Sequence, residues 1–528
     1  MITIYNLQRL KIKFDVDAIQ MSLWPETVFE PVERSPDKTA LIAGDMSLTY
    51  AQLRQQVRRL AGFLAARFSS GSRFGILLPN SIAAALGLLA APPAGLIAVP
   101  IDTDTSIPNF KRLITSCGID VLLTSKKMLA RFKPDVKTQI LADDDSASLA
   151  GSSLSKIFRD AGYERNIFPT ASADAVAFLL HTTGTSGAPK GVMLTRRNLG
   201  AAVRHIIGFM GFGNDIVESI PMRLSHSFGF ARFRSVLEVG GTAILEEGFL
   251  RPERVLHRIK KFGANALSSV PAGFAVLLEH FAEQFREVGP QLRFIEIGSA
   301  PMIRRHKEML LDLCPNARIC MHYGLTESSR AFFLDLRAEK DRWGTVGRPA
   351  PGIEIRIEDE GGNKLERDTS GEIFLRGETT AAGYWGRPDL DKLAFGDGWF
   401  RTGDLGYLDA AGYLHLTGRA AEMINLGGLK VAPREVEEAL LTLDGIREAA
   451  VLGIPSEIAV TGNIIKAFLV VRRPDRPPNI EDLTKALLRV IEPYKVPEEF
   501  EIVPALPKTD SGKVRKDLLL AAARGRHG

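Results

Sequence analysis

Hydrophobic and polar residues alternate along residues 40–130 in blocks whose period changes from one segment to the next. Short apolar runs at 40–43 and 74–78 have the length of strands, and the segment between them, 50–68, repeats its apolar residues at helical spacing. Strands that alternate with amphipathic helices favour a parallel sheet covered by helices. The first part of the chain is therefore predicted to have an α/β fold.

A segment without charges, residues 81–100, has the length of a transmembrane helix. Two prolines and a glycine interrupt it at 92–95, and a proline inside a helix removes a backbone hydrogen bond. We therefore predict a buried helix at 82–91, followed by a buried strand at 96–99, and no membrane span. The polar stretch at 143–155 is expected to be a surface connection.

The same alternation of strands and helices returns in residues 216–301. The expected elements are strands at 242–245, 266–270 and 294–297, with helices at 253–262 and 273–285. This second block therefore predicts a second α/β subdomain.

The pattern of apolar and turn-forming residues changes near residue 344. Short alternating strands, separated by glycine, proline and acidic turns, predict a small antiparallel barrel or meander at 353–357, 371–375 and 413–416. Beyond Gly418, a compact α+β unit is expected from helices at 433–441 and 480–491 and strands at 448–454 and 464–471. The predicted fold is α/β: a large N-terminal domain (1–418) of two helix-covered α/β subdomains plus a small β-barrel (344–418), with a smaller, mobile α+β C-terminal domain (419–528).

Composition narrows the class of protein. The 528 residues are 45% apolar and 24% charged, which is ordinary for a globular protein, and 67 basic against 62 acidic residues leave a formal net charge of +5. The basic residues are scattered as pairs without interleaved aromatics, which argues against nucleic-acid binding. Three cysteines without metal-ligand spacing, and a charged start to the chain in place of an apolar signal segment, predict a cytoplasmic protein with reduced thiols.

A run rich in glycine, serine and threonine, HTTGTSGAPKG at 181–191, stands between apolar runs at 175–180 and 192–194. Its glycines allow successive backbone amides to turn inward around an anion, with hydroxyls and a lysine nearby. The spacing differs from that of the Walker A motif, and the first helix signal comes only at Thr195. The run alone, expected to be a loop, fits either a phosphate cradle or a flexible surface hairpin.

Five further motifs follow this run along the chain. They are YGLTES at 323–328, GEIFLRG at 371–377, RTGDLGY at 401–407, GR at 418–419 and PKTDSGK at 507–513. Each is weak alone, but the ordered set resembles the acyl-adenylate-forming superfamily of acyl-CoA synthetases, adenylation domains and luciferases. The resemblance extends over nearly the whole chain and implies that the glycine-rich run binds the phosphates of ATP.

The resemblance also assigns nucleotide-binding residues. They are Thr182, Thr183, Gly184, Thr185, Ser186, Gly187, Lys190, Gly298, Ser299, Ala300, Pro301, Tyr323, Gly324, Thr326, Asp404 and Arg419. By resemblance, Tyr323 stacks on adenine and Asp404 accepts the ribose hydroxyls. Glu327 is implied to hold Mg²⁺, a hard cation that needs only one or two carboxylates beside phosphate oxygens.

Four residues are implied to be catalytic: Lys513, Thr326, Glu327 and His226. The ammonium of Lys513 would neutralise charge as two anions approach each other, although a lysine in such a turn is by itself usually only solvated. His226 matches the residue that borders the acyl pocket, although a lone histidine is more often structural. No aspartate occurs in 221–234 to pair an ammonium group, so we expect a substrate acid without an α-amino group.

The function that the resemblance implies is that of an AMP-forming acid–thiol ligase. A fatty or aryl acid would react with ATP and Mg²⁺ to give acyl-AMP, and coenzyme A would then take the acyl group. A carrier-protein thiol as acceptor and a non-catalytic nucleotide or acyl-adenylate sensor remain alternatives. The resemblance implies that the C-terminal domain rotates about a hinge just after Arg419. Ala421 replaces the charged hinge residue common in the family, which affects how this domain would move. We expect a monomer or a homodimer.

Overall fold

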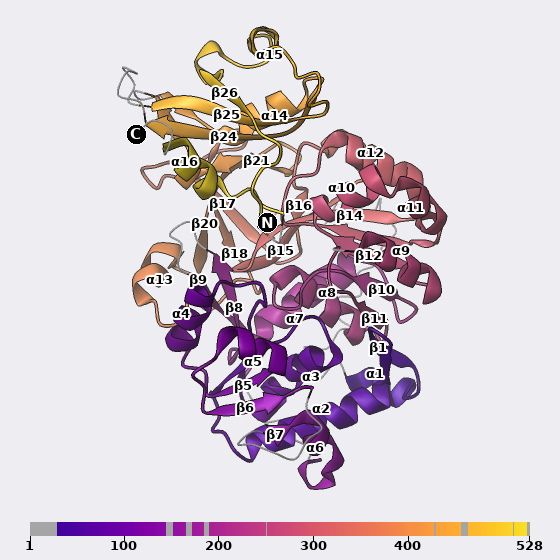
Figure 1. Ribbon diagram of the computed structural model, residues 1–528. Coiled ribbons are helices and arrows are strands. Elements are labelled where there is room, and N and C mark those ends of the chain that lie inside the picture. The colour runs from indigo at the N-terminus through magenta and orange to yellow at the C-terminus, as the bar shows by residue number, and fades with distance from the viewer. Residues whose placement is uncertain are drawn as a thin grey trace. The chain divides into compact units, whose positions relative to one another are not determined.

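The computed structural model describes residues 29–143, 152–164, 172–183, 189–249, 251–426, 429–455, 463–509 and 512–524. The chain forms two compact units, and segments from distant parts of the sequence contribute to both (Figure 1). The first unit comprises Met1–Leu250, Lys261–Ala266 and Ala381–Arg387, and the second comprises Arg251–Lys260, Leu267–Thr380 and Pro388–Gly528.

The first unit contains a sheet whose described strands run in the order β7-β6-β5-β3-β4-β8-β9. Their bounds are β3 Arg73–Leu77, β4 Ile97–Pro100, β5 Val121–Thr124, β6 Thr138–Leu141, β7 Ser152–Ser153, β8 Val176–Thr183 and β9 Pro189–Thr195. All neighbours pair in parallel except β8 and β9, which form an antiparallel hairpin. The sheet therefore ends in the hairpin that carries the glycine-rich run.

Helices precede or separate these strands in the sequence. They are α2 Tyr50–Ala65, α3 Ile82–Ala90, α4 Ile107–Cys117, α5 Lys126–Phe132 and α6 Leu154–Arg159, with the short α1 Glu30–Arg34 ahead of them. Phe110 and Leu113 of α4 pack in one core cluster with Leu122 and Leu179 of the sheet. Burial of such side chains contributes roughly 1.5–3 kcal/mol each, which explains why this amphipathic helix folds onto the sheet.

A second group of strands in the first unit runs in the order β10-β11-β1-β2. Their bounds are β1 Thr39–Ala43, β2 Met46–Thr49, β10 Val217–Ile220 and β11 Thr242–Leu245, with helices α7 Arg196–Met210 and α8 Ser227–Glu238. The side chains of Glu218 and Arg232 form an ion pair of 2.5 Å that is fully buried between β10 and α8. This pair ties the middle of α8 to the strand β10.

The second unit continues with β12 Ala266–Ser269, β13 Phe294–Ile297, β14 Arg318–Leu325, β15 Ser328–Asp335 and β16 Arg348–Pro349. β13 and β14 pair in parallel, whereas β15 pairs in the antiparallel direction with both β14 and β16. The helices of this part are α9 Pro252–Lys261, α10 Pro271–His280, α11 Ala282–Val288 and α12 Arg304–Leu313. The central strand β13 has all four of its side chains buried.

An antiparallel sheet follows, as its glycine-punctuated pattern predicts. Its strands are β17 Glu354–Glu358, β18 Gly371–Arg376, β19 Phe395–Gly396, β20 Trp399–Leu408 and β21 Leu414–Arg419, with α13 Pro388–Ala394 beside β19. β20 pairs with β18, β19 and β21, so it is the central strand of the sheet.

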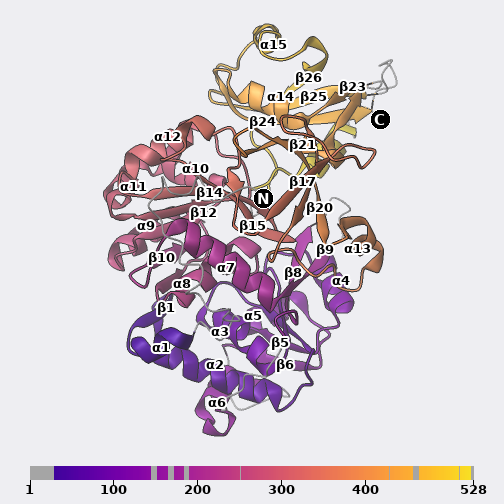
Figure 2. The ribbon, with the colours of Figure 1, turned by 180° about the vertical axis from the view of Figure 1, so that it is seen from behind.

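The C-terminal part is a three-stranded sheet of β24 Ile446–Pro455, β25 Asn463–Val471 and β26 Glu499–Ile502, together with the hairpin of β22 Ile424–Leu426 and β23 Leu429–Val431 (Figure 2). Side chains of α14 Pro433–Leu441 and α15 Ile480–Leu487 share one core cluster with these strands, and those of α16 Lys516–Arg524 share another. The predicted α+β composition of this part is therefore correct.

The predicted α/β fold is confirmed, with four local corrections. The predicted helix at 273–285 is two helices, because Phe281 leaves the helical conformation with φ of −132°. The helix expected at 480–491 ends at Leu487, where exposed apolar residues follow and offer no burial to extend it. The connection expected at 143–155 already contains β7 and the start of α6.

The fourth correction concerns the glycine-rich run, whose ends are strands. His181 pairs with Gly191 and Thr182 with Lys190, so both ends of the run belong to strands, and residues 184–188 lie outside the described part. The three cysteines are buried and not in disulfides, as expected. Within the described ranges, no helix combines the length and the apolar character needed to cross a membrane. The domain boundary at residues 418–419 stays a prediction.

Candidate active site

Tyr323, Asp404 and Arg419 meet in the second unit. The Tyr323 hydroxyl donates a hydrogen bond of 2.6 Å to one carboxylate oxygen of Asp404, and Arg419 Nε lies 2.8 Å from the other oxygen. Asp404 and Arg419 are register partners on β20 and β21. Both oxygens of one carboxylate are therefore oriented by groups from two different sheets.

The surroundings of Tyr323 keep its phenol hydroxyl protonated. Burial, followed by the negative charge of Asp404, holds the pKa of Tyr323 well above its usual value, so the hydroxyl is a permanent donor. Thr402 fixes the backbone here, since its hydroxyl accepts from the amide of Asp404 at 3.0 Å and donates to the carbonyl of Ile373 at 2.8 Å. Gly403 between them has φ of 72°, a conformation that favours glycine. The TGD segment is part of strand β20.

Thr326 and Glu327 form the two-residue turn of the β14–β15 hairpin. Leu325 and Ser328 pair across this turn, and Glu327 is only 8% exposed. Gly324 lies at a register shift just before the turn, and a Cβ placed on it would lie 2.7 Å from the backbone nitrogen of Arg330. Glycine is required there because the two strands approach too closely for a side chain.

Gly298, Ser299, Ala300 and Pro301 follow the carboxyl end of β13, where open α/β sheets bind ligands. Ser299 has φ of 74°, which is strained for a residue with a side chain. A Cβ on Gly298 would lie 2.0 Å from the ring of His322, so the imidazole covers this glycine directly.

Beneath this turn lies a buried charge network that the sequence patterns did not reveal. His322 Nδ1 lies 2.7 Å and Arg330 Nε 3.2 Å from the same carboxylate oxygen of Glu296, and all three side chains are at most 5% exposed. The network holds the His322 ring over Gly298. His322 directly precedes Tyr323, so the same strand supplies a support for the turn and a side chain to the Asp404 group.

Lys513 lies on a hairpin whose ends bridge at Lys508 and Val514. Its amide donates to the Thr509 hydroxyl at 3.1 Å, and its carbonyl accepts from the Thr509 amide at 2.7 Å. Gly512 before it has φ of 80°, and a Cβ there would lie 2.9 Å from the Cβ of Ala272 on α10. The hairpin therefore packs closely against the remainder of the second unit.

The charges around Lys513 are those of the Asp404 group. Removal of the ammonium from water and repulsion by Arg419 lower the pKa of Lys513, while Asp404 and Glu327 oppose this effect. Four residues that the sequence singled out separately, Lys513, Arg419, Asp404 and Glu327, thus interact electrostatically in one region of the second unit.

The remaining predicted residues belong to the first unit. Thr182 and Lys190 face each other in register on β8 and β9, and the ammonium of Lys190 lies 5.2 Å from the ring centroid of Tyr384. Thr183 and Pro189 form the next pair. Gly184, Thr185, Ser186 and Gly187 lie outside the described residues.

His226 occupies the N-cap position of α8 without a capping hydrogen bond from its side chain, and Nε2 of its ring lies 2.5 Å from a carboxylate oxygen of Asp102. Asp102 follows β4, at the carboxyl edge of the parallel sheet. Sequence patterns did not single out Asp102, because the pair is separated by 124 positions.

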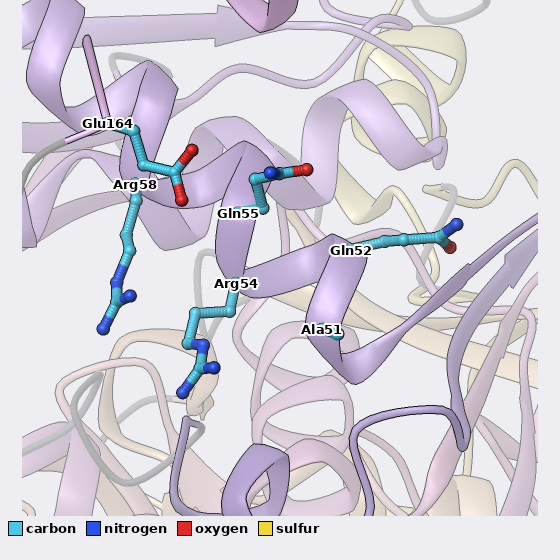
Figure 3. A pocket seen from close by; sticks show the side chains of 6 residues that line it. All are labelled: Ala51, Gln52, Arg54, Gln55, Arg58 and Glu164. Atoms are coloured by element: carbon cyan, nitrogen blue, oxygen red, sulfur yellow. The ribbon is translucent and has the colours of Figure 1, made fainter. Parts of the chain in front are cut away.

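One shallow cavity of the first unit, about 250 Å³, contains none of the predicted residues (Figure 3). Figure 3 shows Arg54 and Arg58 extending to the same side of α2, with Glu164 nearby. Arg54 bonds Glu33, and Glu164 accepts from Arg59 at 2.9 Å. Two of the charged side chains that line the cavity thus have ion-pair partners, and the cavity contains none of the predicted residues, so it is not the candidate site.

The family model for AMP-binding enzymes matches residues 28–385, and the model for the AMP-binding enzyme C-terminal domain matches residues 435–513. The chain belongs to the AMP-binding enzyme family. It is 30% identical to an oxalate–CoA ligase of Arabidopsis thaliana over 92% of this chain and 96% of the relative. It is 29% identical to a 2-succinylbenzoate–CoA ligase of Bacillus subtilis over 95% of this chain and 98% of the relative.

Solved structures of AMP-binding enzymes agree with this assignment. The o-succinylbenzoate CoA synthetase of Bacillus subtilis, in complex with its acyl-adenylate intermediate, has a TM-score of 0.80 at 27% identity and covers 94% of this chain and 98% of its own. An ATP-bound MatB from Rhodopseudomonas palustris has a TM-score of 0.84 at 26% identity, with 95% and 99% coverage. The predicted family and enzyme class are therefore confirmed.

The residues of the second unit fit a magnesium nucleotide. Ser328 Oγ and Thr379 Oγ1 are buried near the Glu327 turn and have no hydrogen-bond partner among the described residues, so polar ligand atoms could satisfy them. In the part of the chain that the structure describes, no group of three or more His, Cys, Asp or Glu side chains is arranged to hold a metal ion. A single carboxylate, Glu327, is what Mg²⁺ needs when phosphates supply the other ligands.

Proposed function

We propose that this AMP-binding enzyme is an AMP-forming acid–CoA ligase that activates a carboxylic acid without an α-amino group. The observation that carries the proposal is the arrangement of Tyr323, Asp404 and Arg419 in electrostatic contact with Glu327 and Lys513. A dedicated carboxylate for ribose hydroxyls, a metal-binding carboxylate and a mobile lysine are the groups that an adenylation reaction needs. Named relatives with CoA ligase activity support the same reaction.

In the first half-reaction, a carboxylate oxygen of the acid attacks the α-phosphorus of ATP, and the bond to the bridging oxygen breaks so that pyrophosphate leaves. Lys513 stabilises the charge that builds up between the incoming carboxylate and the phosphate. Asp404 accepts the ribose hydroxyls while Tyr323 and Arg419 keep its two oxygens fixed. Mg²⁺, when bound by Glu327, neutralises phosphate charge.

The glycine-rich run is proposed to bind the β- and γ-phosphates through its backbone amides, with Thr182 and Lys190 at its ends. Thr326, beside Glu327 in the hairpin turn, is proposed to donate its hydroxyl to a phosphate. Gly298 to Pro301 is proposed to line the adenine and acyl sites, since the turn follows a strand's carboxyl end.

In the second half-reaction, the sulfur of coenzyme A attacks the acyl carbon, the bond to AMP breaks and the thiol proton is released to solvent. We propose that the C-terminal domain, 419–528, turns about Arg419 to Ala421 and withdraws Lys513 between the two steps. Glu422, next to Ala421, bonds Lys516 at 2.9 Å, so the hinge region is tied to the helix after the lysine hairpin. The enzyme is proposed to work in the cytoplasm as a monomer or a homodimer.

Exchange of labelled pyrophosphate into ATP tests the proposal. The purified chain is incubated with Mg²⁺, ATP and one acid at a time: oxalate, sulfoacetate, ferulate, 2-succinylbenzoate, and aliphatic acids of short, medium and long chain. Exchange that depends on one of these acids is expected, and amino acids should give none. A sensor would give no exchange with any acid. If exchange occurs but coenzyme A does not accept the acyl group, a carrier-protein thiol is the acceptor.

A further inference from the structure

Four side chains, three of them charged, form a chain of contacts at the start of α8 in the first unit. His226 Nε2 lies 2.5 Å from one carboxylate oxygen of Asp102, whose other oxygen bonds Nη1 of Arg223. Nη2 of the same guanidinium bonds Asp104. Asp104, Arg223 and Asp102 thus alternate in charge, and Asp102 is the member that contacts His226.

The Asp102 carboxylate determines which ring nitrogen of His226 carries a proton. Burial raises the pKa of Asp102, but interactions with His226, the backbone amide of Asp104 and the charge of Arg223 together outweigh this effect and lower the pKa to about 2. A carboxylate that is ionised at neutral pH can only accept, so Nε2 must donate. Nδ1 is then the ring nitrogen that Asp102 does not use.

The backbone around His226 is held independently of Asp102. Asn80 accepts from the amide of Leu224 and donates to the carbonyls of Met222 and Glu246, each at 2.9 Å. A Cβ on Gly229 would lie 2.4 Å from the carbonyl oxygen of Arg223, so the first turn of α8 packs directly on this segment. Because the main chain has these anchors, the folded position of the segment does not require the Asp102 carboxylate.

The side chain of His226 remains accessible. It is 40% exposed, against 22% for Asp102. A histidine buried for packing alone would instead be covered and satisfied within the core. The ring of His226 is therefore oriented on one side by a carboxylate and available on the other.

We propose that Asp102 is a positioning residue, which holds the His226 ring by Nε2 and leaves Nδ1 to contact the acyl substrate. This inference rests on the proposed function, because it assumes that His226 borders the acyl group. Asp102 itself touches neither ATP nor coenzyme A in this proposal. Its effect passes through the orientation and the tautomer of one imidazole.

Kinetic analysis of Asp102→Asn, Asp102→Ala, His226→Ala and the double variant tests the inference. With an acid that the wild type accepts, we expect Asp102→Asn to lower kcat/KM for the acid about ten- to a hundredfold, the range expected for loss of a charged hydrogen bond, with KM for ATP unchanged. Because Asp102 acts through His226, the double variant should be no slower than His226→Ala alone.

Asp104→Asn is the matched control. Like Asp102→Asn, this variant removes one carboxylate that bonds Arg223, but the Asp104 carboxylate is not the one that bonds His226. The kcat/KM of Asp104→Asn should therefore stay within about twofold of the wild type. Additive losses in the double variant, or an equal loss in Asp104→Asn, would overturn the inference. Asp102→Asn is nearly isosteric, so it keeps the test available if Asp102→Ala does not fold.

A spectroscopic measurement separates this inference from the proposed function. The chain has nine histidines, and ¹⁵N–¹H correlation spectra of labelled protein, with His226→Ala to assign the signal, report the tautomer of each neutral ring. We expect His226 as the Nε2–H form in the wild type and a mixture in Asp102→Asn. A wild-type Nδ1–H form refutes the role of Asp102, whereas an absence of exchange with every acid refutes only the proposed function.

Discussion

Replacement of Tyr323 by phenylalanine removes one hydroxyl from the Asp404 group and leaves the aromatic ring in place. The lost hydrogen bond is 2.6 Å long, is partly buried and ends on a carboxylate. Hydrogen bonds to charged groups contribute roughly 1.5–3 kcal/mol, and about 1.4 kcal/mol corresponds to tenfold in affinity. Arg419 still holds the other oxygen of Asp404, so we expect the lower end of this range.

The variant should therefore raise KM for ATP about tenfold in pyrophosphate exchange and leave KM for the acid unchanged. Its free energy of unfolding should fall by about 1–2 kcal/mol, measured by urea denaturation, because the carboxylate loses a buried donor. The phenol of Tyr323 stays protonated, so the ratio of variant to wild type should be constant between pH 6 and 9.

Tyr407→Phe is the control, because Tyr407 lies on β20 with Asp404 and its ring stacks on that of His415, with 4.5 Å between the ring centroids. This variant should keep KM for ATP within about twofold. An unchanged KM for ATP in Tyr323→Phe, or an equal rise in Tyr407→Phe, would refute the assignment of the Asp404 group to the nucleotide.

Three further outcomes are expected. Lys513→Ala should remove most acid-dependent exchange and spare thioester formation from supplied acyl-AMP, and an equal loss of both activities would contradict its assigned role. Gly298→Ala should abolish exchange, since its Cβ would overlap the His322 ring at 2.0 Å, and activity near that of the wild type would be inconsistent with the packing described. Burial raises the pKa of Cys117 to about 11 and that of Cys314 to about 12, and all three cysteines are buried. Native protein at pH 8 should therefore not react with a thiol reagent that labels three thiols per chain after unfolding. Rapid labelling of the native protein would disprove this expectation.

Apolar periodicity predicted most elements of the fold because their burial is regular. The strand predicted at 242–245 is β11, in which all four side chains are buried, and the helix signal at Thr195 marks the N-cap of α7. The break at Phe281 was not predictable from periodicity, since apolar residues continue at helical spacing through it. The TGD segment reads as a turn in isolation and becomes a strand only through pairing with β18 and β21.

The candidate site was predictable where side chains belong to local motifs. Glu327, Asp404 and Lys513 each stand in a short recognisable pattern, and the structure brings their charges into one region. Asp102 was missed because its partner, His226, lies 124 positions away on another element. Such pairs carry no periodic signal, since only the fold places them together.

The products formed from acid, ATP and coenzyme A test the central claim most directly. Chromatography coupled to mass spectrometry, with a substrate acid identified by exchange, should show acyl-CoA, AMP and pyrophosphate accumulating in equal amounts, all dependent on Mg²⁺. Formation of ADP and phosphate in place of AMP and pyrophosphate, or acyl-CoA without AMP, would contradict the claim.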